Sequence, residues 1–110
     1  SKSIGTAIAA AYAAGKGLDV CHIMYTPLAE TFDLLREDTG NDRVIAFHGT
    51  ADPWSDTKRL KEICIKRSIP LFISEGGNHS LETGQVERDL EELQKVMEQT
   101  RSYINRMSCL

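Results

Sequence analysis

The apolar run Val44–Phe47 constrains the fold of this chain more than any other stretch of its sequence. A strand with apolar side chains on both faces has to be covered on both faces, which is typical of a parallel sheet between layers of helices. Further strands are expected at Val20–Tyr25 and Leu71–Ile73, with helical segments between them. We therefore predict an α/β fold, a three-layer α/β/α arrangement whose mostly parallel sheet has about three strands, each followed by a helix.

Helices are expected before, between and after these strands. The first follows Ser3, runs through an alanine-rich stretch to Ala14, and is stopped by Gly15 and Gly17. The others are expected at Ala29–Glu37, from Ser55 or Asp56 to about Arg67, and from about Val86 to Met107, with a turn at Thr39–Asp42. Apolar residues of the last helix recur at helical spacing and form one stripe, namely Val86, Leu90, Leu93, Met97, Ile104 and Met107.

Length and composition exclude several classes of protein. At 110 residues the chain is at most one domain. Its net charge of −3 gives no electrostatic reason to expect nucleic acid or an anionic membrane as a partner. No apolar run approaches the roughly 20 residues of a membrane helix. Cys21, Cys64 and Cys109 match neither a zinc spacing nor a disulfide framework, so free thiols in a cytoplasmic protein are expected.

Polar side chains follow the strands at the points where catalytic residues of α/β folds gather. Asp52 comes shortly after the Val44–Phe47 strand, and His79 lies in a glycine-rich loop after the next strand. Because the carboxyl ends of parallel strands meet at one edge of a sheet, these two side chains are expected to lie close together. Ser3 would join them if a strand preceded it.

The N-terminal residues Ser1-Lys2-Ser3-Ile4-Gly5 have the outline of a nucleophile elbow, with small residues around a serine that precedes a helix. A serine hydroxyl needs a base, and the base needs a third group that holds its tautomer. Ser3, Asp52 and His79 would then act as nucleophile, orienting acid and general base, with the backbone N–H of Ile4 facing a developing oxyanion.

Simpler interpretations exist for each of these residues. Ser3 could be a helix cap, Asp52 could belong to a strand-ending Asp-Pro turn, and His79 could be a surface loop residue. Asp56 is the rival to Asp52 as the acid, although it is well placed to cap a helix. Trp54 would either line the substrate pocket or cover the end of the sheet.

With these motifs in place, the chain resembles the C-terminal half of an α/β-hydrolase. The elbow, the segment Gly49–Pro53 and the loop Gly77–Ser80 match the chain order of nucleophile, acid and base in that family. The resemblance implies that residues 1–110 are the C-terminal portion of a single α/β-hydrolase domain. It also implies a serine hydrolase that cleaves an ester, thioester or related acyl bond of a small molecule through an acyl-enzyme.

Two departures from the family pattern lead to an alternative. Ser1 stands where the family has the first glycine of the elbow, and the strands before the elbow, with the loop that supplies a second oxyanion donor, are not in this sequence. The alternative is a non-catalytic partial domain or assembly module that retains the triad residues. In that case the edge of the Val20–Tyr25 strand would be a surface for self-association.

Overall fold

The structure, a computed structural model, describes residues 1–39 and 43–107. Its centre is a parallel sheet of three strands, β1 (His22–Tyr25), β2 (Val44–Gly49) and β3 (Leu71–Ser74), in the order β1-β2-β3. Every residue of β2 is buried. This agrees with the expectation from the apolar run that the middle strand is covered on both faces, and the α/β class is confirmed.

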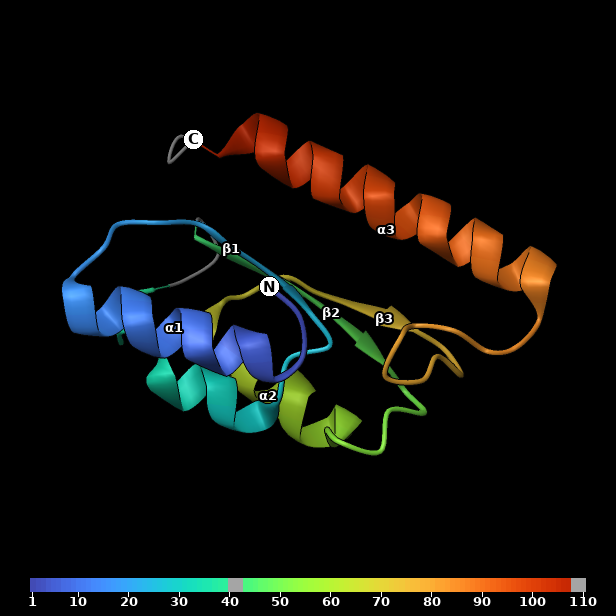
Figure 1. Cartoon of the computed structure of the whole chain (residues 1–110), viewed down its shortest axis with the longest axis horizontal. Helices are drawn as coiled ribbons and strands as arrows, with labels where there is room; N and C mark the ends of the chain where they lie inside the picture. Colours follow the sequence, from blue (N-terminus) through green and yellow to red (C-terminus); the bar gives the residue numbers. More distant parts are fainter. Residues whose placement is uncertain (40–42, 108–110) are drawn as a thin grey trace.

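Helices cover the two faces of the sheet unequally (Figure 1). The α-helices α1 (Ile4–Lys16) and α2 (Thr57–Arg67) lie on one face together with a short 3-10 helix, η1 (Ala29–Leu34). The long helix α3 (Val86–Arg106) lies alone on the other face. A helix therefore follows each strand as predicted, but the one after β1 is a 3-10 helix that ends before the expected Glu37.

Alternate residues of β2 divide the core into two parts. Val44 and Ala46 belong to the apolar cluster beneath α1, η1 and α2, which includes Phe32 and Leu60. Ile45 and Phe47 belong to the opposite cluster, which is completed by the following side chains of α3: Val96 and Tyr103. This alternation is the period of two expected for a strand between two layers.

Helix α3 contacts the sheet mainly through residues other than those of its predicted stripe, although the stripe residue Met107, just beyond the end of the helix, also packs against the cluster of Ile45 and Phe47. Val96 and Tyr103 are its buried residues. Members of the stripe, by contrast, are more than two-fifths exposed at Val86, Leu90, Leu93, Met97 and Ile104. Periodicity identified the amphipathic helix correctly, but it could not indicate how far the helix stands from the sheet.

Some element boundaries differ from the predictions. The first strand begins at His22, so that Val20 and Cys21 lie outside it. Gly15 does not stop α1, which continues to Lys16 and ends with Gly17 in the left-handed conformation. Residues 40–42 of the predicted turn lie outside the described residues.

The expectation of free thiols is wrong for one cysteine. Cys64 is a buried free thiol, and burial raises its pKa to about 11. Cys21 is disulfide-bonded. The spacing of cysteines along the sequence does not show which of their side chains the fold brings together. Cys109 lies outside the described residues. Within those residues, no helix combines the length and apolar character needed to cross a bilayer.

The N-terminal residues extend the sheet beyond β1. Lys2 forms a parallel bridge with Tyr25. The Tyr25 N–H donates to the Ser1 carbonyl at 3.0 Å, and the Ser3 N–H donates to the Tyr25 carbonyl at 3.0 Å. The edge of β1 that was expected to be exposed is therefore covered at its carboxyl end, and Ser3 follows a sheet-paired residue.

Candidate active site

Ser3, Asp52 and His79 each follow a different sheet-paired segment at its carboxyl end. Ser3 comes directly after Lys2, which pairs with β1. Asp52 follows β2, and His79 follows β3. Because these segments run parallel in one sheet, with β1 between Lys2 and β2, three side chains that are distant in sequence reach the same edge of the sheet.

These three side chains form a continuous chain of hydrogen bonds. The Ser3 Oγ lies 2.6 Å from the His79 Nε2, and the His79 Nδ1 lies 2.8 Å from the Asp52 Oδ2. Both distances are within the range of good hydrogen bonds. With a proton on Nδ1, His79 donates to the carboxylate and its Nε2 is free to accept the Ser3 hydroxyl proton.

Asp52 is held on both of its carboxylate oxygens. Its Oδ2 bonds His79, while its Oδ1 accepts the Trp54 backbone N–H at 2.9 Å. The Asp52 side chain is completely buried, whereas that of His79 is 26% exposed. Asp56 is instead the N-cap residue of α2, although its side chain makes no capping hydrogen bond. The geometry therefore favours Asp52 over Asp56 as the partner of the imidazole.

Ser3 has an unusual backbone conformation, with φ 54° and ψ −131°. It occupies the N-cap position of α1, yet its side chain makes no capping hydrogen bond and faces His79 instead. The Gly5 N–H donates to the Lys2 carbonyl and the Thr6 N–H to the Ser3 carbonyl. Among the described residues no acceptor is found for the Ile4 N–H. The first N–H of α1 is thus available beside the serine hydroxyl, as expected for an oxyanion donor.

The loop that carries His79 is fastened to the end of β2. The Ala51 N–H donates to the Gly77 carbonyl at 2.9 Å, and the Gly76 N–H donates to the Thr50 Oγ1 at 2.7 Å. A Cβ added at Gly49 would lie 2.2 Å from the Gly77 carbonyl oxygen, so this position has no room for a side chain. The acid and base segments are therefore in direct backbone contact.

The same loop is held internally by Asn78. The Asn78 Oδ1 accepts the backbone N–H groups of Ser80 at 2.8 Å and of Glu82 at 3.1 Å. The Asn78 N–H in turn donates to the Glu82 carbonyl at 2.9 Å. This turn lies immediately around His79 and limits the positions that the imidazole can adopt.

A further anchor, which the sequence did not predict, connects this loop to α3. The Asp89 Oδ1 accepts the Thr83 N–H at 2.8 Å and the Thr83 hydroxyl at 2.7 Å, and its Oδ2 accepts the Gly84 N–H at 3.1 Å. The hydrogen bond from the Thr83 hydroxyl is the main cause that lowers the pKa of Asp89. The Arg88 guanidinium donates to the Glu75 carbonyl at 2.7 Å. The position of Asp89 in the first turn of α3, where acidic residues are favoured, is the feature of the sequence that could have indicated this anchor.

Trp54 lies against the catalytic histidine candidate. Its ring is 6.4 Å from the His79 ring, centre to centre, in an edge-on arrangement, and the residue is 70% exposed. Trp54 therefore borders the site and leaves much of its surface open to solvent.

The other two histidines lie apart from the triad. His48 is buried, and its Nε2 lies 2.7 Å from the Thr57 hydroxyl, which is its structural partner. His22 is also buried, but no side-chain hydrogen bond is found for it in the described part of the chain. Burial lowers the pKa of both imidazoles; the charges of Asp52 and Asp56 oppose this at His48. No group of His, Cys, Asp and Glu suited to a metal ion is found within residues 1–39 and 43–107.

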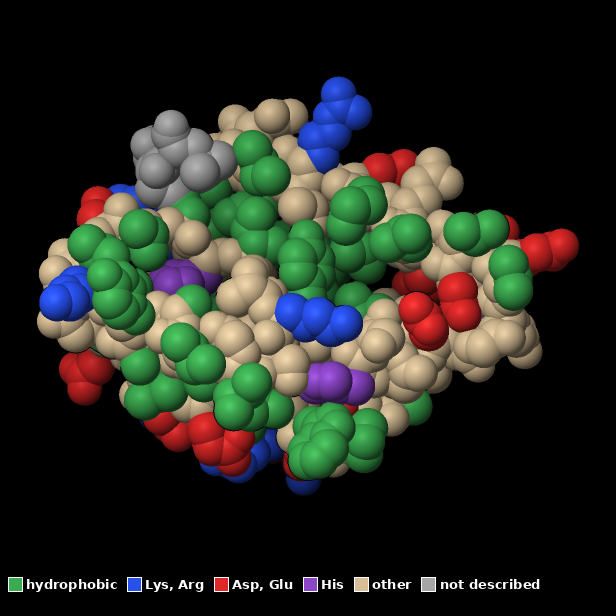
Figure 2. Space-filling view, viewed as in Figure 1, with side chains coloured by type: hydrophobic (Ala, Val, Ile, Leu, Met, Phe, Trp, Pro, Cys, Tyr) green, Lys and Arg blue, Asp and Glu red, His purple; other side chains and the backbone are tan. Residues whose placement is uncertain are grey.

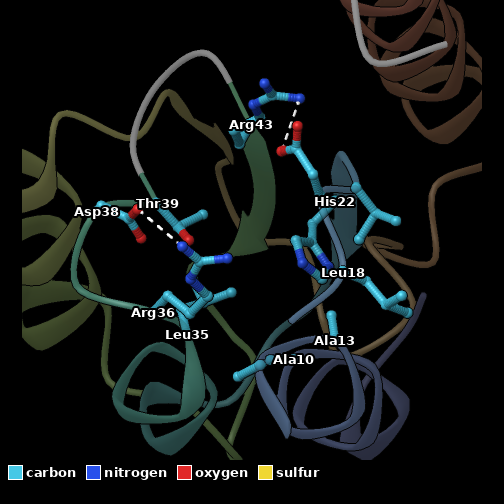
Figure 3. Close-up of a pocket in the computed structure, with 12 residues that line it drawn as sticks. Ala10, Ala13, Leu18, His22, Leu35, Arg36, Asp38, Thr39 and Arg43 are labelled. Carbon is cyan, nitrogen blue, oxygen red and sulfur yellow. Dashed lines mark hydrogen bonds and ion pairs between the residues drawn. The ribbon is translucent and has the colours of Figure 1, made fainter. Parts of the chain in front are cut away.

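A cavity of about 240 Å³ lies at the opposite, amino end of β1, where His22 forms part of its lining (Figure 3). Two ion pairs border it, Arg36 with Asp38 at 3.0 Å and Arg43 with Asp19 at 3.2 Å. Because both guanidinium groups already have carboxylate partners, the lining has little unmatched charge to offer a ligand.

A scan against protein-family models and searches of curated proteins and of solved structures each found no match to the chain. The chemistry of the site is therefore inferred from its own geometry.

Proposed function

We propose that this chain is a serine hydrolase of the α/β-hydrolase type that cleaves an ester, thioester or related acyl bond. The observation that carries the proposal is the hydrogen-bonded series from the Ser3 Oγ through His79 to the buried Asp52 carboxylate. A nucleophile, a base within reach and a group that orients the base are the parts that acyl transfer through serine requires.

In the first step the Ser3 Oγ attacks the carbonyl carbon of the substrate while its proton passes to the His79 Nε2. The resulting imidazolium is stabilised by the Asp52 carboxylate at Nδ1. When the tetrahedral intermediate collapses, the bond to the leaving oxygen or sulfur breaks, and His79 gives its proton to that atom. The products of this step are the free alcohol or thiol and an acyl ester of Ser3.

In the second step a water molecule takes the place of the leaving group. His79 accepts a proton from the water as the water oxygen attacks the acyl carbon, and then returns that proton to the Ser3 Oγ. The carboxylic acid leaves and the enzyme is restored. The Ile4 N–H would donate to the oxyanion in both steps, and one such donor typically contributes about 3 kcal/mol to lowering the barrier.

The proposal requires a small acyl substrate, with no metal and no cofactor. A cytoplasmic location stays a prediction, and the bonded Cys21 counts against the free-thiol argument for it. Self-association through the edge of β1 belongs to the alternative, non-catalytic function.

A fluorophosphonate probe tests the proposal, because it reacts covalently with activated serine hydroxyls. We expect labelling of the folded chain, complete loss of labelling in Ser3→Ala, and a loss of at least about a hundredfold in rate in His79→Gln, which lacks the general base. Asp52→Asn should slow labelling by about a thousandfold or more through the wrong histidine tautomer. The matched variant Asp56→Asn should leave the rate unchanged.

A folded chain that takes up no probe would contradict the proposal and favour the non-catalytic partial domain. Circular dichroism of each variant shows whether the chain is folded, so that loss of labelling is not confused with loss of structure. Equal effects of Asp52→Asn and Asp56→Asn would overturn the assignment of the acid.

A further inference from the structure

An apolar groove of about 500 Å³ runs between the first half of α3 and the β1 side of the sheet. In the space-filling view, hydrophobic side chains gather along the edge of α3 that faces the sheet, and the surface is hollowed there (Figure 2). Its volume lies within the range of small-molecule pockets. Most of its apolar wall comes from α3 and the loop before it, through Leu81, Val86, Leu90, Leu93, Val96 and Met97.

The groove begins beside the triad. Two of its lining residues are Lys2 and Ser80. Lys2 is bonded in sequence to Ser3, and Ser80 is bonded to His79. Neither Ser3 nor His79 lines the groove itself, but one end of the groove lies a single residue away from each of them, which places it close to their hydrogen bond.

Towards its other end, a hydrogen bond joins the sheet and the helix that form the walls of the groove. The Tyr25 hydroxyl and the Thr100 hydroxyl lie 2.8 Å apart, which connects β1 to α3. Exposure of the apolar residues falls along the helix towards this point, from 73% at Val86 to 47% at Met97, and Val96 is only 8% exposed. An extended apolar chain entering from the triad would therefore be progressively better covered as it lengthens.

Charge along the rim disfavours an anionic occupant. Glu82, Asp89 and Glu92 line the groove together with a single cationic residue, Lys2. The apolar wall and the acidic rim together select an uncharged hydrocarbon over a phosphate or a second carboxylate.

We propose that this groove holds the acyl chain of the substrate, which makes the enzyme selective for acyl groups of medium length over acetyl. The inference rests on the proposed function, because it assigns the substrate class of the same site. Its occupant is the hydrocarbon part of the acyl group, with the carbonyl carbon at Ser3.

A series of p-nitrophenyl esters from acetyl to decanoyl tests this inference with the full chain. Burial of each added methylene should raise kcat/KM by about two- to fourfold until the groove is filled. Leu90→Gln and Leu93→Gln place amides in the groove wall. We expect each to lower kcat/KM for the octanoyl ester by about tenfold and to change that for the acetyl ester by less than about twofold.

Ile104→Gln is the matched control. Ile104 belongs to the same apolar stripe of α3 and is 42% exposed, but it does not line the groove. This variant should keep the dependence on chain length. All three residues are exposed, so the substitutions are expected to leave the fold intact, which circular dichroism can verify.

The possible results separate the two proposals. Turnover of acetyl and octanoyl esters at equal rates, or equal effects of Leu90→Gln and Ile104→Gln, would overturn the acyl groove while leaving the serine hydrolase in place. Turnover of no ester at all, with no fluorophosphonate labelling of Ser3, would overturn both. A dimer of the native chain that Leu90→Gln dissociates would show that a second copy, not an acyl chain, occupies the groove.

Discussion

Ser3 has a backbone conformation that an L-residue rarely adopts. Its φ of 54° is positive, and its ψ of −131° lies outside the left-handed helical region. Such strain costs on the order of 1–3 kcal/mol and persists when surrounding contacts enforce it. Here the enforcing contacts are the Ser3 N–H bond to the Tyr25 carbonyl and the start of α1. The sharp turn presents the hydroxyl to His79, so the strain belongs to the proposed chemistry.

This strain predicts a difference between two inactive variants. Ser3→Ala keeps the Cβ that disfavours the conformation, whereas Ser3→Gly removes it. Glycine also loses more entropy on folding, which offsets part of the gain. We expect the unfolding free energy of Ser3→Gly to exceed that of Ser3→Ala by about 1 kcal/mol, measured by urea denaturation. A less stable glycine variant would indicate that Ser3 is unstrained in solution.

The residues of the candidate site could be named from the sequence because each follows a strand, and parallel strands end at one edge. The position of a residue after a strand could not decide whether Asp52 or Asp56 is the partner of the imidazole. Both follow β2, and the rotation of the chain after Gly49 decides which carboxylate reaches the imidazole. That rotation depends on the close approach of Gly49 to Gly77, a contact between residues far apart in sequence.

At the scale of elements, the loop between β3 and α3 positions His79, the proposed general base. The Asp89 carboxylate binds Thr83 and Gly84 from the first turns of α3, while Asn78 closes the turn around His79. Asp89 contacts neither His79 nor Ser3 in these hydrogen bonds. It is therefore a positioning residue, which acts through the loop.

Loss of this anchor should affect turnover more than binding. Asp89→Ala removes all three hydrogen bonds, and a displaced imidazole reacts more slowly, so we expect kcat to fall by about tenfold or more with little change in KM. Asp89→Asn should recover part of the loss, because its amide oxygen can still accept hydrogen bonds from Thr83. Glu91→Ala, at an exposed neighbouring position of α3, is the control.

Kinetics on acetyl and octanoyl esters decide whether Asp89 acts through the loop. An equal loss of kcat for both esters agrees with displacement of His79. A rise in KM confined to the octanoyl ester would instead show that Asp89 acts on the acyl chain as a lining residue of the groove.

The elements themselves were predictable to different degrees. The run Val44–Phe47 identified β2 because apolar residues on both faces require two covering layers. Helix α3 was recognised from its period, but its contacts were not. The residues that pack on the sheet, Val96 and Tyr103, are offset from the stripe that periodicity selects. Tertiary contacts such as the Tyr25–Thr100 hydrogen bond set the rotation and distance of the helix, and these contacts leave no local signal.

At the scale of the whole molecule, two buried histidines couple folding to pH. His22 and His48 are 8% and 0% exposed, and burial lowers the pKa of each from the ordinary 6.5. In the unfolded chain both imidazoles take up protons near pH 6.5, whereas in the folded protein they do so only at lower pH. The unfolded state therefore binds more protons below that value, and acid favours unfolding.

We expect the free energy of unfolding to be highest above pH about 6.5 and to decline as pH falls below it, by at most about 1.4 kcal/mol per pH unit for each histidine. Urea denaturation between pH about 7.5 and about 5 measures this slope. His22→Gln should reduce the slope by removing one of the two groups. The His79→Gln variant shows whether the partly exposed imidazole of the site contributes to the slope. If the free energy of unfolding did not depend on pH over this range, His22 and His48 would be protonated as readily in the folded protein as in the unfolded chain. That result would mean that water reaches both imidazoles through the covering layers.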